Sequence, residues 1–525
     1  MRRALVFAVL VVGIVANTVH AAAPDSVFNT YVQALLAGDW EQAKAQWLPE
    51  EVAASQRLGV EFTGAPLKVD CSSPLLEHRD AINSGVVTIS VTEPFRDEQR
   101  MVVKRVTLQT KNGQSVTATY PIVPRDGRWY LTSRIWWETK SWPTRDTRYV
   151  RVYMLDSTLV NNVALAEIDR FVDSLLGVFK ATSEQRIRLT SQKILYFLAD
   201  KGTVQSLSAY DVHGVSYRPL DAVITSHLPH EHELTHVVAD YVLSPLPMYS
   251  LPVLQEGLAV ACGGRWGKSP RVVLGLGAFI LQSSLISPDQ ILTDRGFHDD
   301  AATSDLAYAA AGVLTRYLLE SLGWEHFSSL YRRLSGPEPY VAGLSVNEIE
   351  KILSEVTGQP WDGLVRSCVA IANESADHEA GIWPDAGAHL TASLIYENAS
   401  DSLTLRLYTA DSDLYLETSG RVSTRQHGLL MTLKSSPANS RYRSTLFDDQ
   451  WPTVGYKGES CAIVLESTEA GVYDYRTNTL LAKFAAGFSA GQSFRDDAAG
   501  RNRVRIGRDV LPVAIDSVEF QVLSR

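Results

Sequence analysis

The sequence predicts an α+β protein built from three domains. Its 525 residues suggest that number, because domains typically contain about 100–200 residues. The spacing of apolar residues changes along the chain. It predicts helices followed by strands in the first part, and strands followed by long helices in the middle. In the last part every second residue is apolar, which is typical of strands. We place the domains at residues 24–142, 143–375 and 376–525, after a leader at residues 1–23.

The composition is that of a globular protein, with 45% apolar and 21% charged residues. A formal net charge of −10 gives no reason to expect nucleic acid as a partner. The four cysteines allow three complete disulfide pairings. Cys262 and Cys368 fall within one predicted domain and are the expected pair, whereas Cys71 and Cys461 fall in the two others. The oligomeric state is left open.

Residues 1–23 are typical of a secretory signal. Arg2 and Arg3 precede an apolar run at residues 4–16, and small residues suited to cleavage follow it. The run is short for a bilayer span, so an uncleaved anchor is the less favoured alternative. We therefore expect an exported protein, periplasmic or secreted, with no membrane span after cleavage.

The first domain, residues 24–142, begins with two helical stretches. Apolar residues at helical spacing occupy residues 27–36 and 40–47, with a break at Gly38-Asp39. Strands are predicted afterwards at residues 86–91, 101–110, 115–123 and 128–131. The stretches AGDWEQAKAQW and DGRWYLTS resemble the ketosteroid-isomerase-like cone fold. Because fold alone does not give function, we expect an accessory or interaction domain.

The middle domain, residues 143–375, places strands before a set of helices. One helix is predicted to begin at Pro229, whose missing N–H suits a first helical position, and to end near Ser244, before Pro245. Strands are predicted at residues 149–154, 193–198 and 222–225. The other helices are predicted at residues 160–179, from 252 to Gly263-Gly264, and at 272–284, 304–322, 324–334 and 345–373.

Period-two alternation dominates from residue 376 onward. Short strands are predicted at residues 390–396, 403–408, 414–417, 461–466 and 518–523. Turn residues separate these strands, a pattern typical of a β-sandwich. We find no catalytic constellation in this part of the sequence and expect structural support or binding.

The residues that carry chemistry lie in the middle domain. His232-Glu233-Leu234-Thr235-His236 is an H-E-x-x-H pattern, and residues four apart lie on one face of a helix. His232 and His236 can therefore present two imidazole nitrogens to one cation, with Glu233 beside a bound water. Glu256 follows on the next predicted helix, where Gly257 permits two helices to approach closely.

An H-E-x-x-H pattern is short enough to arise by chance. The alternative is therefore a solvated helix face on which the two histidines are unrelated. Three features favour a metal site. The motif follows a strand and lies on a predicted helix, Glu256 follows at a ligand-compatible distance on a second helix, and the glycine after Glu256 permits close helix approach. His227 and His230 lie nearby in the sequence. We expect them to be loop or first-turn residues, because three protein ligands suffice for a catalytic zinc.

The sequence around the motif resembles the gluzincin metallopeptidases. Residues 232–241, HELTHVVADY, are similar to the thermolysin-like branch, as is the gap between His236 and Glu256. Residues 253–259, VLQEGLA, and the helix at 308–323 instead resemble the aminopeptidase-N-like branch. The resemblance implies a zincin-like domain that is mostly helical and contains a small sheet.

This resemblance also implies roles for five residues. His232, His236 and Glu256 would bind one Zn²⁺ per chain and leave a fourth position for water. Glu233 would be the general base, and Tyr308 would help to stabilise the oxyanion. For Tyr308, core packing on an Ala-rich helix is an equally weighted alternative.

The sequence departs from both branches. The Gly-x-Met-Glu-Asn element of the aminopeptidases is absent, so an endopeptidase is favoured over an aminopeptidase. Val260 replaces the Asp that follows the ligand Glu by four residues in the thermolysin-like branch. Either another carboxylate or carbonyl orients a zinc histidine, or zinc binds more loosely. Asp240 is near in sequence and is a candidate, but a position on the helix surface explains it equally well.

Two functions are compatible with these patterns. The leading hypothesis is an exported zinc metallopeptidase that acts on peptides or proteins. The alternative is a non-catalytic zinc-binding scaffold that binds a protein or a cell-envelope component. The intact Glu233 favours the enzyme, because a degenerate site need not retain its base.

Overall fold

The computed structural model describes the chain from residue 23 to residue 380 with short gaps, and beyond that only a set of strands. The described residues are 23–97, 100–110, 113, 115–157, 160, 162–265, 270–282, 286–298, 301–337 and 344–380, together with the strands that lie between 393 and 524. Between residues 23 and 380 helices and strands are mixed, which is compatible with the predicted α+β class. The predicted secretory signal lies outside the described residues, apart from Ala23.

The chain forms two compact units. The first is Met1–Pro49 with His78–Ser133, and the second is Glu50–Glu77 with Arg134–Arg525. The sequence-based domain boundary at residue 142 kept residues 50–77 with the preceding helices, whereas they pack within the second unit. The division into an N-terminal cone, a zincin-like domain and a β-sandwich stays a prediction.

The first unit pairs short helices with a four-stranded antiparallel sheet in the order β2-β3-β4-β5. Its first helix has Pro24 in its first turn and ends at Gly38, whose φ of 78° suits glycine. All four predicted strands are confirmed. The elements are α1 (Pro24–Ala37), α2 (Trp40–Lys44), α5 (Arg79–Asn83), β2 (Val87–Asp97), β3 (Met101–Thr110), β4 (Ser115–Arg125) and β5 (Arg128–Leu131).

The second unit contains a five-stranded sheet in the order β6-β7-β8-β10-β9. Strands β7, β8 and β10 are parallel, and β6 and β9 pair antiparallel at the edges. Every residue of β8 and β10 is buried, as expected for central parallel strands. The strands are β6 (Thr144–Asp146), β7 (Val150–Met154), β8 (Ile194–Leu198), β9 (Gly214–Tyr217) and β10 (Ala222–Thr225).

Several helices and short strands accompany this sheet. A capping box, in which the side chains of Thr182 and Gln185 each bond the other's backbone N–H, begins α8. A short parallel pair, β1 (Phe62–Thr63) with β11 (Leu246–Pro247), joins residues 50–77 to the rest of the unit. The helices are α3 (Pro49–Gln56), α4 (Pro74–Glu77), α6 (Arg134–Thr139), α7 (Asn162–Val178), α8 (Ser183–Gln192) and α9 (Lys201–Ser208).

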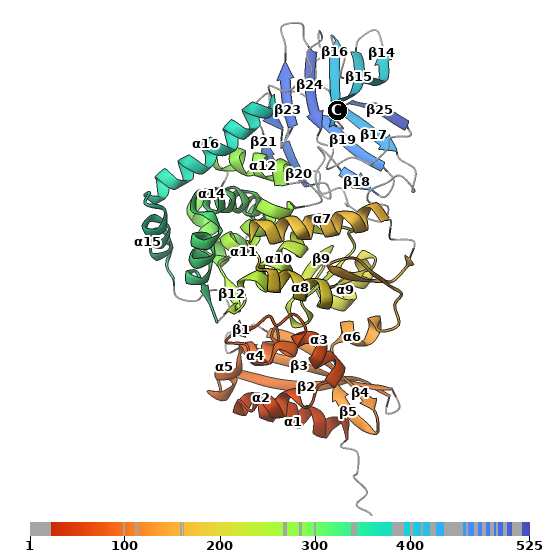
Figure 1. Ribbon diagram of the computed structural model, residues 1–525, viewed down its shortest axis with the longest axis vertical. Coiled ribbons are helices and arrows are strands. Elements are labelled where there is room, and N and C mark those ends of the chain that lie inside the picture. Colours follow the sequence, from red (N-terminus) through yellow and green to blue (C-terminus); the bar gives the residue numbers. More distant parts are fainter. Residues whose placement is uncertain are drawn as a thin grey trace, which may run out of the picture. The chain divides into compact units, whose positions relative to one another are not determined.

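The part of the second unit that follows this sheet, up to residue 380, is mainly helical (Figure 1). Helix α10 packs against α7 and α11, and α11 packs against α14. The predicted stop at Gly323 is a non-helical residue within α14, with a φ of 69°. The elements are α10 (Glu231–Leu243), α11 (Pro252–Gly263), α12 (Pro270–Gln282), α13 (Asp294–His298), α14 (Ala301–Arg333), α15 (Val346–Thr357), α16 (Trp361–Ala380), β12 (Tyr249–Ser250) and β13 (Ser335–Gly336).

Beyond residue 392 the described segments are all strands. They pair in the orders β14-β15-β16-β24-β23-β22, β18-β19-β17-β25 and β20-β21. The predicted strands agree with five of them, whereas packing of the sheets as a sandwich stays a prediction. The strands are β14 (Ser393–Ala399), β15 (Leu403–Ala410), β16 (Asp413–Gly420), β17 (His427–Lys434), β18 (Gly455–Lys457), β19 (Ser460–Glu466), β20 (Gly471–Asp474), β21 (Thr479–Lys483), β22 (Phe488–Ser489), β23 (Gln492–Asp496), β24 (Arg501–Ile506) and β25 (Ser517–Ser524).

The expected disulfide between Cys262 and Cys368 is wrong. Both are free thiols, on α11 and α16 respectively. Falling in one domain does not bring two Cα atoms within the roughly 7 Å that a disulfide requires. Burial raises the pKa of each thiol to about 12, so both remain protonated and weakly reactive.

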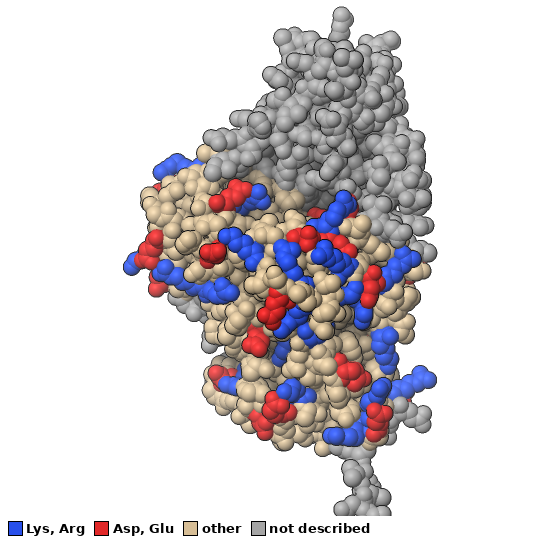
Figure 2. All heavy atoms as spheres, in the orientation of Figure 1, with Lys and Arg blue, Asp and Glu red and all other residues tan. Residues whose placement is uncertain are grey.

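The surface and the helices give two further observations. Figure 2 shows Lys and Arg side chains interspersed with Asp and Glu over the described part of the visible face. Among the described residues, no helix combines the length and the apolar character that a bilayer crossing requires.

Candidate metal centre

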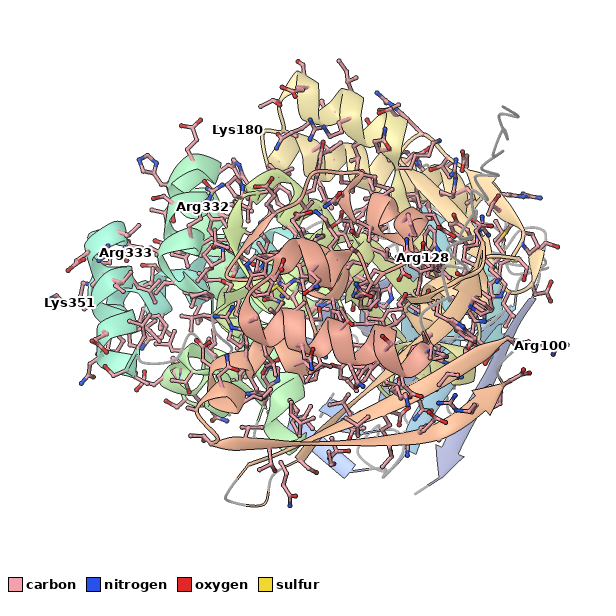
Figure 3. All side chains as sticks on the ribbon, turned by 90° about the horizontal axis from the view of Figure 1, so that it is seen from below. Arg100, Arg128, Lys180, Arg332, Arg333 and Lys351 are labelled. Atoms are coloured by element: carbon pink, nitrogen blue, oxygen red, sulfur yellow. The ribbon has the colours of Figure 1, made fainter. Side chains whose placement is uncertain are left out.

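The H-E-x-x-H pattern lies on α10, which follows the buried strand β10. The helix begins at Glu231, with His230 as its N-cap residue, and ends at Leu243. The prediction that Pro229 takes the first helical position is therefore wrong, because His230 has non-helical backbone angles and separates that proline from the helix. At the other end, Arg332, labelled in Figure 3, donates a hydrogen bond to the carbonyl oxygen of Leu243 at 2.7 Å. This bond satisfies an acceptor that the helix end leaves unpaired.

Glu256 lies on α11, which is held closely between α10 and α14. A Cβ atom at Gly257 would lie 2.3 Å from Oγ1 of Thr315 and 2.7 Å from the carbonyl oxygen of Ala311. The hydroxyl of Thr315 donates to the carbonyl oxygen of Val253 at 2.7 Å. The predicted role of Gly257 in close helix approach is confirmed, and it sets the depth at which Glu256 lies.

Helices α10 and α11 bring His232, His236 and Glu256 together. One ligand atom from each residue lies within 4.8 Å of the other two. The Nε2 atoms of His232 and His236 lie 3.1 Å and 3.4 Å from the same Oε2 atom of Glu256. Both imidazoles are buried, and Glu256 is partly buried. Two imidazole nitrogens and one carboxylate are a donor set of catalytic zinc sites, so these residues fit that metal.

A backbone carbonyl orients the first histidine. The Nδ1 atom of His232 lies 2.8 Å from the carbonyl oxygen of Gly264. A carbonyl accepts only, so Nδ1 carries the proton and Nε2 is left with its lone pair toward Glu256. This contact supplies the orienting group that Val260 cannot provide. Among the described residues, none accepts a hydrogen bond from Nδ1 of His236.

His236 and Glu256 shift the pKa values of each other. Burial disfavours the imidazolium of His236, but the neighbouring Glu256 carboxylate outweighs burial and raises the pKa of His236. Burial also disfavours the ionised form of Glu256, yet the neighbouring imidazole of His236 holds the pKa of that carboxyl well below its usual range. Glu256 is therefore ionised, as a metal ligand must be, and a cation that binds here competes with the proton of His236.

Glu233 lies one residue from His232 on α10 and is partly exposed. Its carboxylate makes no hydrogen bond or ion pair with any of the residues that the structure describes. A carboxylate that no protein group binds can accept a hydrogen bond from a water molecule, and this one lies beside the candidate metal ligands. This is the environment that a general base requires.

Tyr308, on α14, lies beside the metal-ligand group. Its ring centre is 6.5 Å from that of His232 and 4.8 Å from that of Phe297, and Cζ of Arg265 lies 3.2 Å from it. Burial, reinforced by the Glu256 carboxylate, raises the pKa of Tyr308, so its hydroxyl remains a hydrogen-bond donor. The ring both packs in the core and borders the site.

Three further histidines gather before α10. The ring of His227 is centred 5.2 Å from that of His213 and 4.9 Å from that of His230. Nδ1 of His230 and Oγ1 of Thr225 lie 2.7 Å apart. The group of possible metal ligands found in the described part of the chain does not include these histidines.

Asp240 is buried, so of the two alternatives for this residue the helix-surface one is wrong. It is 6% exposed, and its Oδ2 atom accepts a hydrogen bond from Nε of Arg218 at 3.0 Å. Arg218 also donates to the carbonyl oxygen of Met248 at 2.8 Å. Helical spacing alone did not reveal this burial, because α10 is covered on several sides.

Comparisons with protein-family models, with curated proteins and with solved structures give no match for this chain. The site itself is a cluster of two histidines and one glutamate on two packed helices, with a glutamate and a tyrosine beside it. Sequence reasoning missed Gly264 and Arg265. It interpreted Gly263-Gly264 only as a helix end. The available signal was a pair of glycines shortly after the helix that carries Glu256.

Proposed function

We propose that this protein is an exported zinc metallopeptidase. The observation that carries the proposal is the convergence of His232, His236 and Glu256 within 4.8 Å, with Glu233 next to one of these ligands on the same helix. A chance H-E-x-x-H pattern on a solvated helix would not place its histidines in the core or turn both toward a glutamate of another helix. The residue pattern at 1–23 supports export.

The proposed metal is one Zn²⁺ per chain, held by His232, His236 and Glu256. Zinc bound by three protein ligands supplies a Lewis acid and lowers the pKa of a bound water toward about 7. The hydrogen bond from Nδ1 of His232 to Gly264 favours this role, since it directs the Nε2 lone pair toward the other two ligands.

Glu233 acts as the general base in this proposal. Its carboxylate takes a proton from the water that attacks the peptide carbonyl and then passes the proton to the leaving amine. Tyr308 donates a hydrogen bond to the oxyanion that develops on the former carbonyl oxygen. The raised pKa of Tyr308 supports this role, because a donor must keep its proton at neutral pH. We favour endopeptidase over aminopeptidase activity, because the Gly-x-Met-Glu-Asn element is absent.

The proposal is tested by zinc content and by cleavage of a peptide pool followed by mass spectrometry. Glu233→Gln should retain zinc and lose cleavage by about 10²–10⁴-fold, the usual contribution of a general base. Glu320→Gln removes a carboxylate that pairs with Arg316 at the surface of α14 and serves as the control, which should stay active. One zinc per chain with no cleavage by the wild type would instead favour the non-catalytic scaffold. Unchanged zinc content in His232→Ala would contradict the ligand assignment.

A further inference from the structure

Residues 263–265 immediately follow the turns of α11 that carry Glu256, and they touch the candidate metal centre at two points. We propose that Gly263-Gly264-Arg265 is a positioning segment, in which the carbonyl of Gly264 fixes the zinc ligand His232 and the guanidinium of Arg265 holds Tyr308. This inference rests on the proposed zinc site. It assigns Gly263, Gly264 and Arg265 a positioning role in addition to ending α11.

Gly264 reaches the ligand because of its backbone conformation. Its φ of 72° and ψ of −160° lie in a region that is essentially restricted to glycine. Its N–H still closes the helix by bonding to the carbonyl oxygen of Val260 at 2.9 Å. The chain then turns so that the carbonyl of Gly264 meets Nδ1 of His232 at 2.8 Å, within the buried part of the site. One residue therefore ends α11 and sets the tautomer of a metal ligand on α10.

Gly263 lets the end of α11 approach the start of α10. A Cβ atom at this position would lie 2.5 Å from the carbonyl carbon and oxygen of Glu231 and 2.6 Å from the backbone nitrogen of His232. These are backbone atoms, which cannot move aside as a flexible side chain can. The Gly264 carbonyl can reach His232 because the two helices meet without an intervening side chain.

Arg265 continues the segment to the tyrosine. Its Cζ atom lies 3.2 Å from the ring centre of Tyr308, which places the guanidinium over the ring face. Phe297 also packs against this ring, at 4.8 Å between ring centres and an interplanar angle of 69°. A tyrosine ring held by two neighbours has few orientations for its hydroxyl. We expect Arg265 to position this donor, and its planar group makes Lys an imperfect substitute.

The first test compares the zinc affinities of the full-length variants Gly264→Ala and Gly323→Ala. Gly323 is a matched control, because its φ of 69° and ψ of 164° impose the same backbone strain on alanine, and a Cβ atom there would meet nothing within 4 Å. Gly264→Ala should bind zinc about 10–100-fold more weakly than wild type, whereas Gly323→Ala should bind it normally. Equal affinities in the two variants overturn the inference. A wild type that binds no zinc contradicts the proposed function instead.

Histidine side-chain NMR of the zinc-loaded wild type decides the matter if Gly264→Ala does not fold. One of the two imidazoles that shift on zinc binding should show a slowly exchanging Nδ1 proton, since His232 donates to Gly264. The other should exchange rapidly. Rapid exchange at both imidazoles overturns the role of Gly264.

A double-mutant cycle tests Arg265. Arg265→Met should lower kcat about tenfold at unchanged KM and zinc affinity, and Arg265→Lys should restore part of the loss. If Arg265 acts through the tyrosine, Arg265→Met should cost nothing further in a Tyr308→Phe background. Additive losses in the cycle contradict this role.

Discussion

The Nε2 atom of His232 lies 3.1 Å from the Oε2 atom of Glu256, although 24 positions separate the two residues. Because Nδ1 of His232 donates to Gly264, the neutral imidazole has no proton on Nε2, and a carboxylate has none to give. Two hydrogen-bond acceptors at this distance repel each other unless a proton or a cation lies between them. The contact between Nε2 and Oε2 therefore favours binding of a positive charge.

Zinc affinity should depend on pH through His236. The pKa of His236 is raised above its ordinary value of 6.5, so its protonated pairing with Glu256 stabilises the zinc-free protein fully below about pH 6.5 and is lost as pH rises through the raised pKa. The pKa of Glu256 is lowered below 4.5, so its contribution is present above about pH 4.5 and is lost as pH falls through the lowered value.

Below the raised pKa of His236, zinc must displace the proton of that imidazole. Calorimetric titration in buffers of different ionisation enthalpy should therefore show release of about one proton per zinc below about pH 6.5, where His236 is protonated and a zinc-bound water is not yet ionised. Zinc affinity should rise with pH through the raised pKa of His236. An affinity that does not change between about pH 5 and pH 8 would contradict the pairing of these two side chains.

Removing the hydroxyl of Tyr308 should slow catalysis and leave the metal in place. Loss of one oxyanion donor typically lowers kcat by about 10²–10³-fold, so Tyr308→Phe should do this at unchanged zinc content. Tyr317→Phe is the matched control on the same helix, because that hydroxyl accepts a hydrogen bond from Nε2 of Gln359 and takes no part in the site. Steady-state kinetics of the two variants decide whether the tyrosine acts at the reaction or only packs.

Close packing at Gly257 should make an added methyl group costly. In Gly257→Ala the new Cβ atom would meet Thr315 and Ala311, and overpacking of this kind costs about 1–3 kcal/mol. Displacement of α11 would also move the Glu256 carboxylate, so zinc binding should weaken.

The control for this substitution is Gly177→Ala on α7, where a Cβ atom would meet nothing within 4 Å. Its expected effect is a gain of about 0.5 kcal/mol, because alanine favours the helix. Denaturant unfolding of both variants measures the difference. Equal stability of the two would show that α11 and α14 do not pack as closely as described.

The buried pair of Arg218 and Asp240 should matter for stability. Their side chains are 15% and 9% exposed, and Arg218→Met leaves an uncompensated carboxylate in the core, which costs about 3–5 kcal/mol. The pair formed by Arg316 and Glu320 is 47% and 48% exposed, so Arg316→Met should cost about 0–1 kcal/mol. Comparable losses in the two variants, measured by denaturant unfolding, would rule out a special role for the buried pair.

Much of the candidate site could be predicted from the sequence because it depends on local spacing. The i, i+4 separation places His232 and His236 on one helix face, and Pro245 ends that helix shortly afterwards. Glu256 was predicted from its position on a second helix, and Gly257 from the close approach it allows. Most element boundaries follow from the same kind of periodicity, as in the three parallel strands β7, β8 and β10.

The remainder depends on contacts between distant segments, which spacing does not reveal. The carbonyl of Gly264 is a backbone group, and its contact with His232 depends on a single unusual conformation. Residues 50–77 join the second unit through hydrogen bonds such as that from Arg57 to the carbonyl oxygen of Leu220, at 2.6 Å. For Asp240 the sequence left two alternatives open, because helical spacing does not show which distant segments cover a residue.

X-ray absorption at the zinc edge tests the central claim most directly. With one zinc added per wild-type chain, the spectrum should fit two imidazole nitrogens at about 2.0–2.1 Å and oxygen ligands at about 2.0–2.2 Å, and Glu256→Gln should weaken binding of the metal. This result would support a zinc centre formed by His232, His236 and Glu256. A sulfur shell at about 2.3 Å, or zinc that does not bind stoichiometrically, would contradict it.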